Sequence, residues 1–125
     1  MPNQGQTLFE RIGGEFTINA VVDEFYDRVL NDDRINYFFD NISMDMQIRK
    51  LKVFLKLAFE EQKTYPSFEM RKAHAPLVER GLNDTHIDIL LEHMTQTLKI
   101  HKVPLDVIEE TINKIEKYRD DVLNR

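Results

Sequence analysis

The sequence predicts an all-α protein, and three observations support this fold class. Apolar residues recur three and four positions apart, whereas strict alternation of apolar and polar residues is nearly absent. Residues that favour helix starts and ends lie at the borders of these apolar stripes. The 125 residues match the usual size of one domain with its own core. We expect residues 1–6 to be a loose tail and residues 7–125 to form one domain.

The first half of the chain predicts three helices. Thr7 with Glu10 forms a capping box before a short helix over Leu8 to Ile12, which the pair Gly13 and Gly14 ends. A second helix is expected to end near residue 30, with an apolar stripe of Ile18, Val21, Val22, Phe25 and Val29. Ser43 is the expected cap of a third helix, which runs to about residue 59.

The second half begins with a weakly patterned stretch. Residues 60–67 are predicted to be irregular, and residues 70–80 to form a short piece that Gly81 closes. Asn83 or Asp84 then caps a long helix whose apolar stripe is Ile87, Leu90, Leu91, Met94 and Leu98. Pro104 suits the first turn of a last helix, whose stripe is Ile108, Ile112, Ile115 and Val122. The prediction is therefore four long helices with short pieces between them.

Composition excludes several classes of function. Because the chain has no cysteine, disulfides, thiolate metal sites and cysteine nucleophiles are excluded. A formal charge of −5 argues against a nucleic-acid partner. No apolar run approaches the roughly 20 residues of a membrane span. Residues 1–6 lack the basic start and apolar run of a signal peptide.

Polar residues on apolar helix faces leave two interpretations open. Gln47 lies on the apolar stripe of its helix, and Tyr26 follows Phe25 in an apolar stretch. A buried amide and a buried phenol both need hydrogen-bond partners. They can satisfy each other or both point at a ligand, and on the residues alone the first is the commoner arrangement.

Other candidate sites are weak. His86 and His93 are seven positions apart and can share a helix face, but solvated histidines more often show this spacing. Neither of the two serines lies in a nucleophile elbow, and the chain has no phosphate-binding loop. The basic residues Arg49, Lys50 and Lys52 are typical of a solvated helix flank.

Three segments resemble the group I truncated haemoglobins, which have a shortened two-over-two helical sandwich around haem. These segments are TLFERIGG, FYDRVLNDDRINYFF and MRKAH, and their order and spacing matter more than any one of them. The resemblance covers residues 7 to the C-terminus, nearly the whole chain. It implies haem b, held non-covalently between the helix after Ser43 and the segment around His74.

The resemblance also assigns roles in haem and gas binding to individual residues. His74 matches the proximal histidine that binds iron, and one axial imidazole leaves the opposite face open for a gas. Tyr26 and Gln47 match the distal pair that donates hydrogen bonds to bound gas, with Leu51 beside them. Phe39 matches the aromatic residue that stacks on haem. The other implied haem-binding residues are Phe38, Lys50, Phe54, Leu55, Leu77, Leu82, His86 and Ile87.

The chain departs from the family pattern at several positions. Leu51 stands where many members carry a second glutamine, and the pair at residues 60 and 61, both glutamate, replaces a common glycine pair. Pro76 disfavours helical geometry at the residue before it, so we expect a kink after His74. Tyr118 falls where one cyanobacterial branch has a histidine bonded covalently to haem, so that linkage is not expected here.

Lys50 has two possible roles under the resemblance. It can pair with a haem propionate as a solvated ammonium, or swing in as a sixth ligand of iron. The second role requires loss of its proton, which costs free energy unless burial lowers its pKa. The sequence favours propionate pairing.

The resemblance implies a cytoplasmic, monomeric haem protein that binds O2, NO and CO reversibly. Given an unidentified reductase, it implies possible nitric oxide dioxygenase activity. The alternatives are a six-coordinate haem protein for redox chemistry or sensing, with Lys50 as distal ligand, and a helical interaction module without haem.

Overall fold

The computed structural model describes residues 7–60 and 64–125, and all regular elements in these ranges are helices. In chain order they are α1 (Leu8–Ile12), α2 (Gly14–Leu30), the 3-10 helix η1 (Asn36–Phe39), α3 (Met44–Phe59), α4 (Ser67–Glu79), α5 (Asp84–Ile100), α6 (Leu105–Glu116) and α7 (Arg119–Val122). The predicted all-α class is confirmed. The expected tail, residues 1–6, and Glu61 lie outside the described residues.

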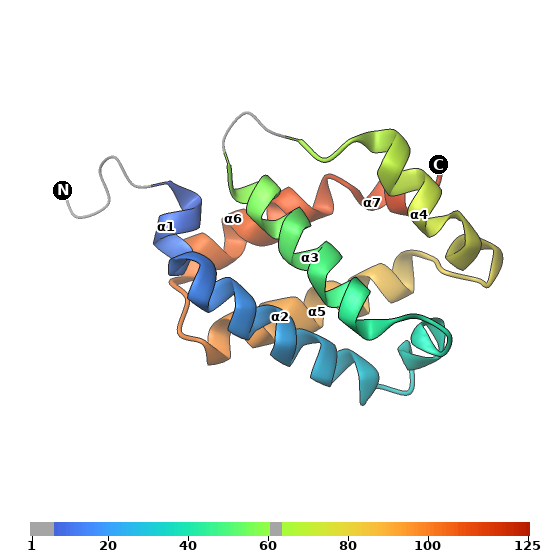
Figure 1. The fold of residues 1–125 in the computed structure, drawn as a ribbon, viewed down its shortest axis with the longest axis horizontal. Coiled ribbons are helices and arrows are strands. Elements are labelled where there is room, and N and C mark those ends of the chain that lie inside the picture. Colours follow the sequence, from blue (N-terminus) through green and yellow to red (C-terminus); the bar gives the residue numbers. More distant parts are fainter. Residues whose placement is uncertain (1–6, 61–63) are drawn as a thin grey trace.

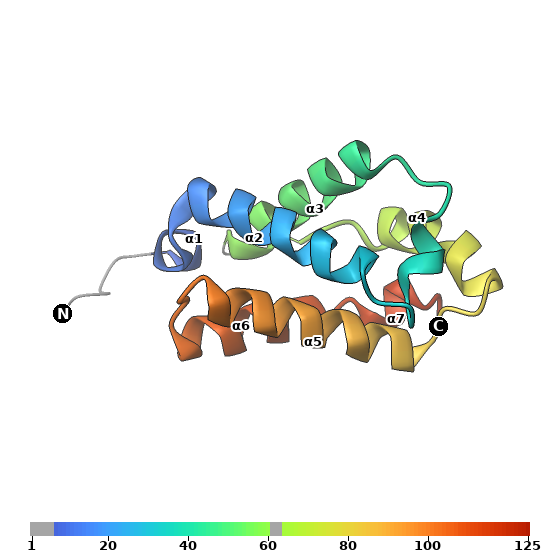
Figure 2. The same ribbon diagram turned by 90° about the horizontal axis from the view of Figure 1, so that it is seen from below.

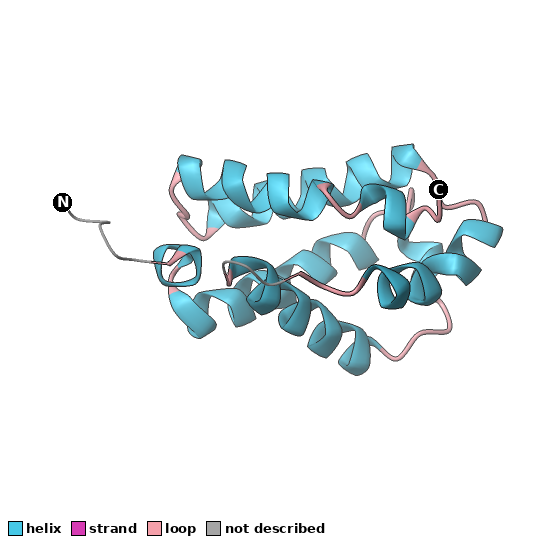
Figure 3. Cartoon of the chain, turned by 90° about the horizontal axis from the view of Figure 1, so that it is seen from above, coloured by secondary structure: helices cyan, strands magenta, loops and turns pink. Residues whose placement is uncertain are grey.

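The helices form two layers. Figures 1 and 2 show α2 and α3 in one layer, with α5 and α6 beneath them in the other. Helix α2 packs on both α3 and α5, and α5 packs on α6. Helices α4 and α7 lie side by side at the end of the molecule away from α1, and loops join the helices around the outside (Figures 1 and 3). This is the two-over-two arrangement that the sequence predicts.

Local signals in the sequence explain where the first helices begin and end. The Thr7 hydroxyl accepts a hydrogen bond from the Glu10 backbone N–H at 3.1 Å, and the Glu10 carboxylate accepts one from the Thr7 N–H at 3.3 Å. Gly13 has a φ of 114°, and a Cβ there would lie 2.2 Å from the Thr17 hydroxyl oxygen. Glycine is therefore required where α1 turns sharply into α2.

The core lies between the two layers. The predicted stripe of α2 is buried, and Ile18, Val22 and Val29 have no exposed surface. Two buried hydroxyls, those of Thr97 and Thr111, donate to the carbonyls of His93 and Val107, so neither is unpaired. Within residues 7–60 and 64–125, no helix combines the length and hydropathy needed to span a bilayer.

The prediction for the segment around His74 was wrong. Instead of a short piece over residues 70–80, α4 is a regular helix of 13 residues that begins at Ser67 and continues three residues past Pro76. Ala75, where a kink was expected, is helical. The helix was hard to recognise because only Met70 is fully buried in it. Its inner face, with Met70, Ala73, His74 and Leu77, lines a cavity.

The last helix also differs from the prediction. It does not run unbroken to Val122, because α6 ends at Glu116 and α7 begins at Arg119. Pro104 caps α6 and precedes its first turn. The break places Tyr118 between the two helices, where its hydroxyl accepts a hydrogen bond from the Tyr65 backbone N–H at 2.9 Å.

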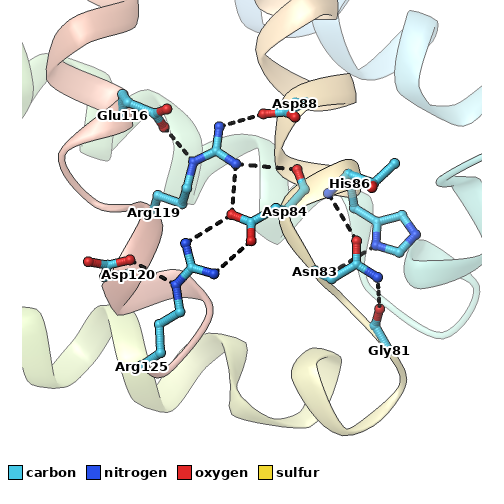
Figure 4. Close-up of polar contacts among 10 residues, drawn as sticks. Gly81, Asn83, Asp84, His86, Asp88, Glu116, Arg119, Asp120 and Arg125 are labelled. Atoms are coloured by element: carbon cyan, nitrogen blue, oxygen red, sulfur yellow. Dashed lines mark hydrogen bonds and ion pairs between the residues drawn. The ribbon is translucent and has the colours of Figure 1, made fainter.

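Ion pairs fasten the C-terminal residues to the start of α5 (Figure 4). Arg119 contacts Asp84 at 3.0 Å and Asp88 at 2.6 Å, and Arg125 contacts the same Asp84 at 2.7 Å. A second set of contacts joins α7 to α4, in which Arg71 pairs with Asp121 at 3.0 Å. The C-terminal segment is thus tied to both α5 and α4.

The turn after α2 is anchored on α5 by one carboxylate. Asp32 accepts hydrogen bonds from His93 Nε2 at 2.7 Å and from the Arg34 guanidinium at 2.7 Å, and its side chain is 11% exposed. Hydrogen bonds from Arg34 first, and then from His93, hold the pKa of Asp32 far below its usual value of 3.8, against the opposite effect of burial.

A carboxyl with a lowered folded-state pKa stabilises the fold above its unfolded pKa, and this contribution is lost as the pH falls toward the folded value. We therefore expect the free energy of unfolding to decline as the pH drops below about 4. In Asp32→Asn this decline should be smaller, measured by urea unfolding at several pH values. Asp33→Asn is the matched control, since Asp33 makes no hydrogen bond or ion pair within the described ranges. Equal declines in both variants would contradict the assignment.

Candidate functional site

A cavity of about 550 Å3 lies within the fold, lined by residues of every helix from α2 to α7 and of η1. Its volume is in the range of small-molecule and cofactor sites, roughly 300–1,000 Å3. Most of its wall is apolar, with a few polar groups from α2, α3 and α4. It is therefore shaped for a large, mainly apolar ligand.

The structure brings together eleven of the thirteen residues that the sequence analysis assigned. The residues that line the cavity are Tyr26, Phe38, Phe39, Gln47, Lys50, Leu51, Phe54, His74, Leu77, Leu82 and Ile87.

Leu55 and His86 are not among the lining residues. Leu55 is 1% exposed and lies in the core with α2 and α6 residues. His86 uses both ring nitrogens elsewhere: Nδ1 accepts from the Asn83 N–H at 3.1 Å, and Nε2 lies 3.3 Å from the Tyr37 hydroxyl. The imidazole of His86 therefore caps α5 and packs on Phe38, with ring centroids 4.9 Å apart.

The imidazole of His74 is held in one orientation by its own helix. Its Nδ1 lies 2.8 Å from the carbonyl oxygen of Met70, one turn earlier in α4. A carbonyl only accepts, so Nδ1 carries the proton and Nε2 keeps a free lone pair. Burial, and to a lesser extent the positive charge of Lys50, lowers the pKa of His74, against the hydrogen bond to Met70. A neutral imidazole with a free Nε2 is the form that binds a metal.

Tyr26 on α2 and Gln47 on α3 lie next to each other in the cavity lining. The Gln47 amide nitrogen donates to the Tyr26 hydroxyl oxygen at 3.1 Å. Since this oxygen accepts from Gln47, the phenol proton is left for another acceptor, and the amide keeps a second N–H. Burial raises the pKa of Tyr26 to about 12, so the phenol stays protonated. The first of the two open interpretations is therefore confirmed, because the two side chains bond each other, and each keeps a donor that this bond does not use.

Aromatic contacts make up much of the wall. Phe39 meets Tyr26 edge to face, with centroids 5.9 Å apart, and holds the phenol in place. On the other side Phe54 meets Tyr65 at 5.8 Å and Tyr118 at 5.1 Å. The hydroxyl of Tyr118 is bonded to the loop before α4, as described above.

Three cations line the cavity, and they differ in their partners. Arg119 is held by three carboxylates. Arg80 donates to the carbonyls of Tyr37 and Phe38, at 2.8 and 3.4 Å, and lies over the Phe38 ring. Lys50 is exposed and has no carboxylate within ion-pair distance among the described residues. It is the cation best placed to receive an acidic group from a ligand.

The sequence analysis missed several lining residues. Leu90, Leu91 and Met94 were predicted as core on the stripe of α5, and they line the cavity as well. No sequence pattern marked Arg80 or Tyr65 as a cavity residue. Both lie in loops between helices, so helix periodicity does not predict where their side chains point. Among these missed residues, only the three on α5 had a signal in the sequence, which was the apolar periodicity of their helix.

These residues fit haem on chemical grounds. The cavity offers an apolar wall with aromatic rings that meet edge to face, one imidazole with a free nitrogen, and one unpaired ammonium for a carboxylate. A group of three or more acidic or histidine side chains that could hold a bare metal ion is absent from the described part of the chain. A single imidazole is enough only if a macrocycle supplies the other ligands of the metal.

Comparisons with known proteins agree with this fit. The family model described as bacterial-like globin matches residues 7–124. The chain belongs to the group 1 truncated haemoglobins. The group 1 truncated haemoglobin of Synechocystis sp. is 42% identical over 95% of this chain and 98% of its own length. That of Tetrahymena pyriformis is 35% identical over 98% of this chain and 99% of its own.

Solved truncated haemoglobins have the same fold. The 2/2 haemoglobin of Synechococcus sp. PCC 7002, in its cyanomet state with covalently attached haem, has a TM-score of 0.88 and 38% identity, over 95% of this chain and 99% of its own. The Fe(III) form from Tetrahymena pyriformis gives 0.83 and 36%, over 94% and 98%. The predicted family and fold are confirmed, and haem b is the cofactor of this family.

Proposed function

We propose that this globin binds O2, and also NO and CO, at a haem b held by His74. The observation that carries the proposal is the placement of His74 and of the pair Tyr26 and Gln47 on the wall of one cavity. Haem, when bound, supplies an iron with one open position for a diatomic gas. The side chains of the protein around the haem then determine how slowly the gas dissociates.

On the proximal side, α4 presents Nε2 of His74 to the cavity. The bond from Nδ1 to the Met70 carbonyl keeps the ring from rotating, and it makes the imidazole a better donor to iron. Leu77 and Leu82 supply apolar surface on the lining near this helix, which excludes water from the imidazole.

On the distal side, Tyr26 and Gln47 donate hydrogen bonds to the gas. A gas held at haem would accept these hydrogen bonds, and hydrogen bonds to charged acceptors stabilise by about 1.5–3 kcal/mol. The bond between the two side chains orients the phenol before the gas arrives. Leu51, beside them, has no donor, so this chain holds O2 with two donors.

The haem is proposed to be non-covalent. Tyr118 occupies the break between α6 and α7, and its hydroxyl already binds the Tyr65 N–H. Because the Tyr118 hydroxyl is already hydrogen-bonded, we do not expect it to form a covalent bond to haem, in contrast to the Synechococcus protein with its covalently attached haem.

Oxidation of NO to nitrate is a further part of the proposal. The apolar cavity admits NO, which is small and uncharged. O2 would supply the two oxygen atoms that turn NO into nitrate, haem would supply one electron, and a separate reductase would return that electron. This activity needs positioning and no acid–base residue, so we assign no catalytic residue. We place the protein in the cytoplasm as a monomer, where reductants are present.

Replacing Tyr26 by Phe should speed O2 release by about tenfold or more, because one hydrogen bond to the gas is lost. Stopped-flow displacement of O2 by CO measures the release rate. Tyr37→Phe is the matched control, since Tyr37 loses only its contact with His86 and does not line the cavity. An unchanged release rate in Tyr26→Phe would refute the distal role of the phenol.

A second candidate function, a six-coordinate haem protein for redox chemistry or sensing, has one observation in its favour. Lys50 lines the cavity, and its charge acts on His74 across it. An amine in this place can reach iron if it loses its proton and the gas is absent. Propionate pairing keeps Lys50 charged and is the role that its exposure supports.

The ferrous spectrum without gas separates the two functions. If Lys50 pairs with a propionate, the spectrum should be that of five-coordinate high-spin haem and should change little in Lys50→Ala. A low-spin spectrum that Lys50→Ala abolishes and Arg49→Ala retains would establish the six-coordinate alternative instead.

A further inference from the structure

Four side chains of α3 form an exposed stripe on the side away from the core. Met46, Arg49, Lys50 and Val53 recur three and four positions apart, so they share one face of the helix. With Tyr65 they line an open cleft of about 210 Å3. Met46 is 56% exposed and Val53 is 58% exposed. Two apolar side chains and two cations thus share one surface, here called the α3 stripe.

Helix α3 has a charge opposite to that of the whole chain. Its charged residues are Asp45, Arg49, Lys50, Lys52 and Lys56, which sum to +3 in a chain of −5. Two of the cations are neutralised by α2, because Lys52 pairs with Asp23 at 3.6 Å and Lys56 with Glu15 at 2.6 Å. These pairs lie on the side of α3 that faces α2.

The cations of the α3 stripe are not neutralised in this way. Neither Arg49 nor Lys50 has a carboxylate within ion-pair distance in residues 7–60 and 64–125. The stripe also borders the haem cavity, because Lys50 and Tyr65 line both the outer cleft and the cavity. A molecule seated on the stripe therefore contacts the cavity wall.

We infer that the α3 stripe is the docking surface for an acidic protein that donates one electron. An acidic partner is repelled by the net charge of −5, so Arg49, the cation of the stripe that neither an ion pair nor the proposed propionate contact neutralises, defines where it can approach. Complexes of redox proteins are small, below about 1,200 Å2, and depend on charge complementarity around a few apolar contacts. Met46 and Val53 supply those contacts.

The inference rests on the proposed function, since the electron is needed to return ferric haem iron to the ferrous state. One electron would pass from the donor's cofactor to the haem iron. The cofactor is then oxidised by one electron, and the iron is reduced from the ferric to the ferrous state. No bond forms or breaks and no proton moves. The stripe positions the donor against the wall that holds Lys50 and Tyr65.

A plant-type [2Fe–2S] ferredoxin, which is acidic and carries one electron, is a suitable probe. Titration calorimetry of the oxidised ferredoxin into the haem-loaded protein at low salt should give a Kd that Arg49→Glu raises by about tenfold. Lys99→Glu changes the net charge equally but lies on α5, in the other layer, and should raise the Kd by less than about twofold.

The outcomes are distinct. Equal effects of Arg49→Glu and Lys99→Glu on the Kd would overturn the docking surface. Binding of the wild-type protein to anionic phospholipid vesicles that Arg49→Glu abolishes, with ferredoxin binding unchanged, would overturn it in favour of a membrane surface. Photoreduction with neutral deazariboflavin tests the haem separately. If the protein does not take up haem, the proposed function is wrong, and the docking inference, which depends on it, is wrong as well.

Discussion

The hydrogen bond from His74 Nδ1 to the carbonyl of Met70 is the constraint on which the site depends. It fixes the tautomer, so Nε2 is free, and it fixes the ring, so Nε2 faces the cavity. Both partners lie in α4, one turn apart, so the bond exists only if this segment is helical. The helix, which has little apolar surface of its own, is kept in place by contacts of Arg71 and Ser67 with Asp121.

Contacts elsewhere in the fold keep α4 in position. Arg119 and Arg125 tie the C-terminal segment to Asp84 at the start of α5, and α7 packs on α4 (Figure 4). Opposite, α2 and α3 bring Tyr26 and Gln47 to one bond of 3.1 Å. The cavity is thus bounded by a fixed donor nitrogen on one helix and fixed hydrogen-bond donors on two others. A flat cofactor between them completes a core that the side chains alone leave hollow.

Much of this could be predicted from the sequence, because strong local signals agree with the tertiary structure. The capping box of Thr7 and the stripe of α2 were sufficient to place two helices. Helix α4 was missed because Pro76 lies inside it and because Met70 is its only fully buried residue. Leu55 shares the periodicity of its helix yet faces the core, and His86 is occupied as a cap, so a family pattern alone could not separate them from cavity residues.

The most direct test of the account is hemin titration of His74→Gly. The wild-type protein should bind one hemin tightly and show the spectrum of a histidine-ligated haem, whereas His74→Gly should lose this spectrum and recover it on addition of free imidazole. His101→Gly, which alters a histidine at the end of α5 outside the cavity lining, should behave as the wild type. Unchanged affinity and spectrum in His74→Gly would contradict the account.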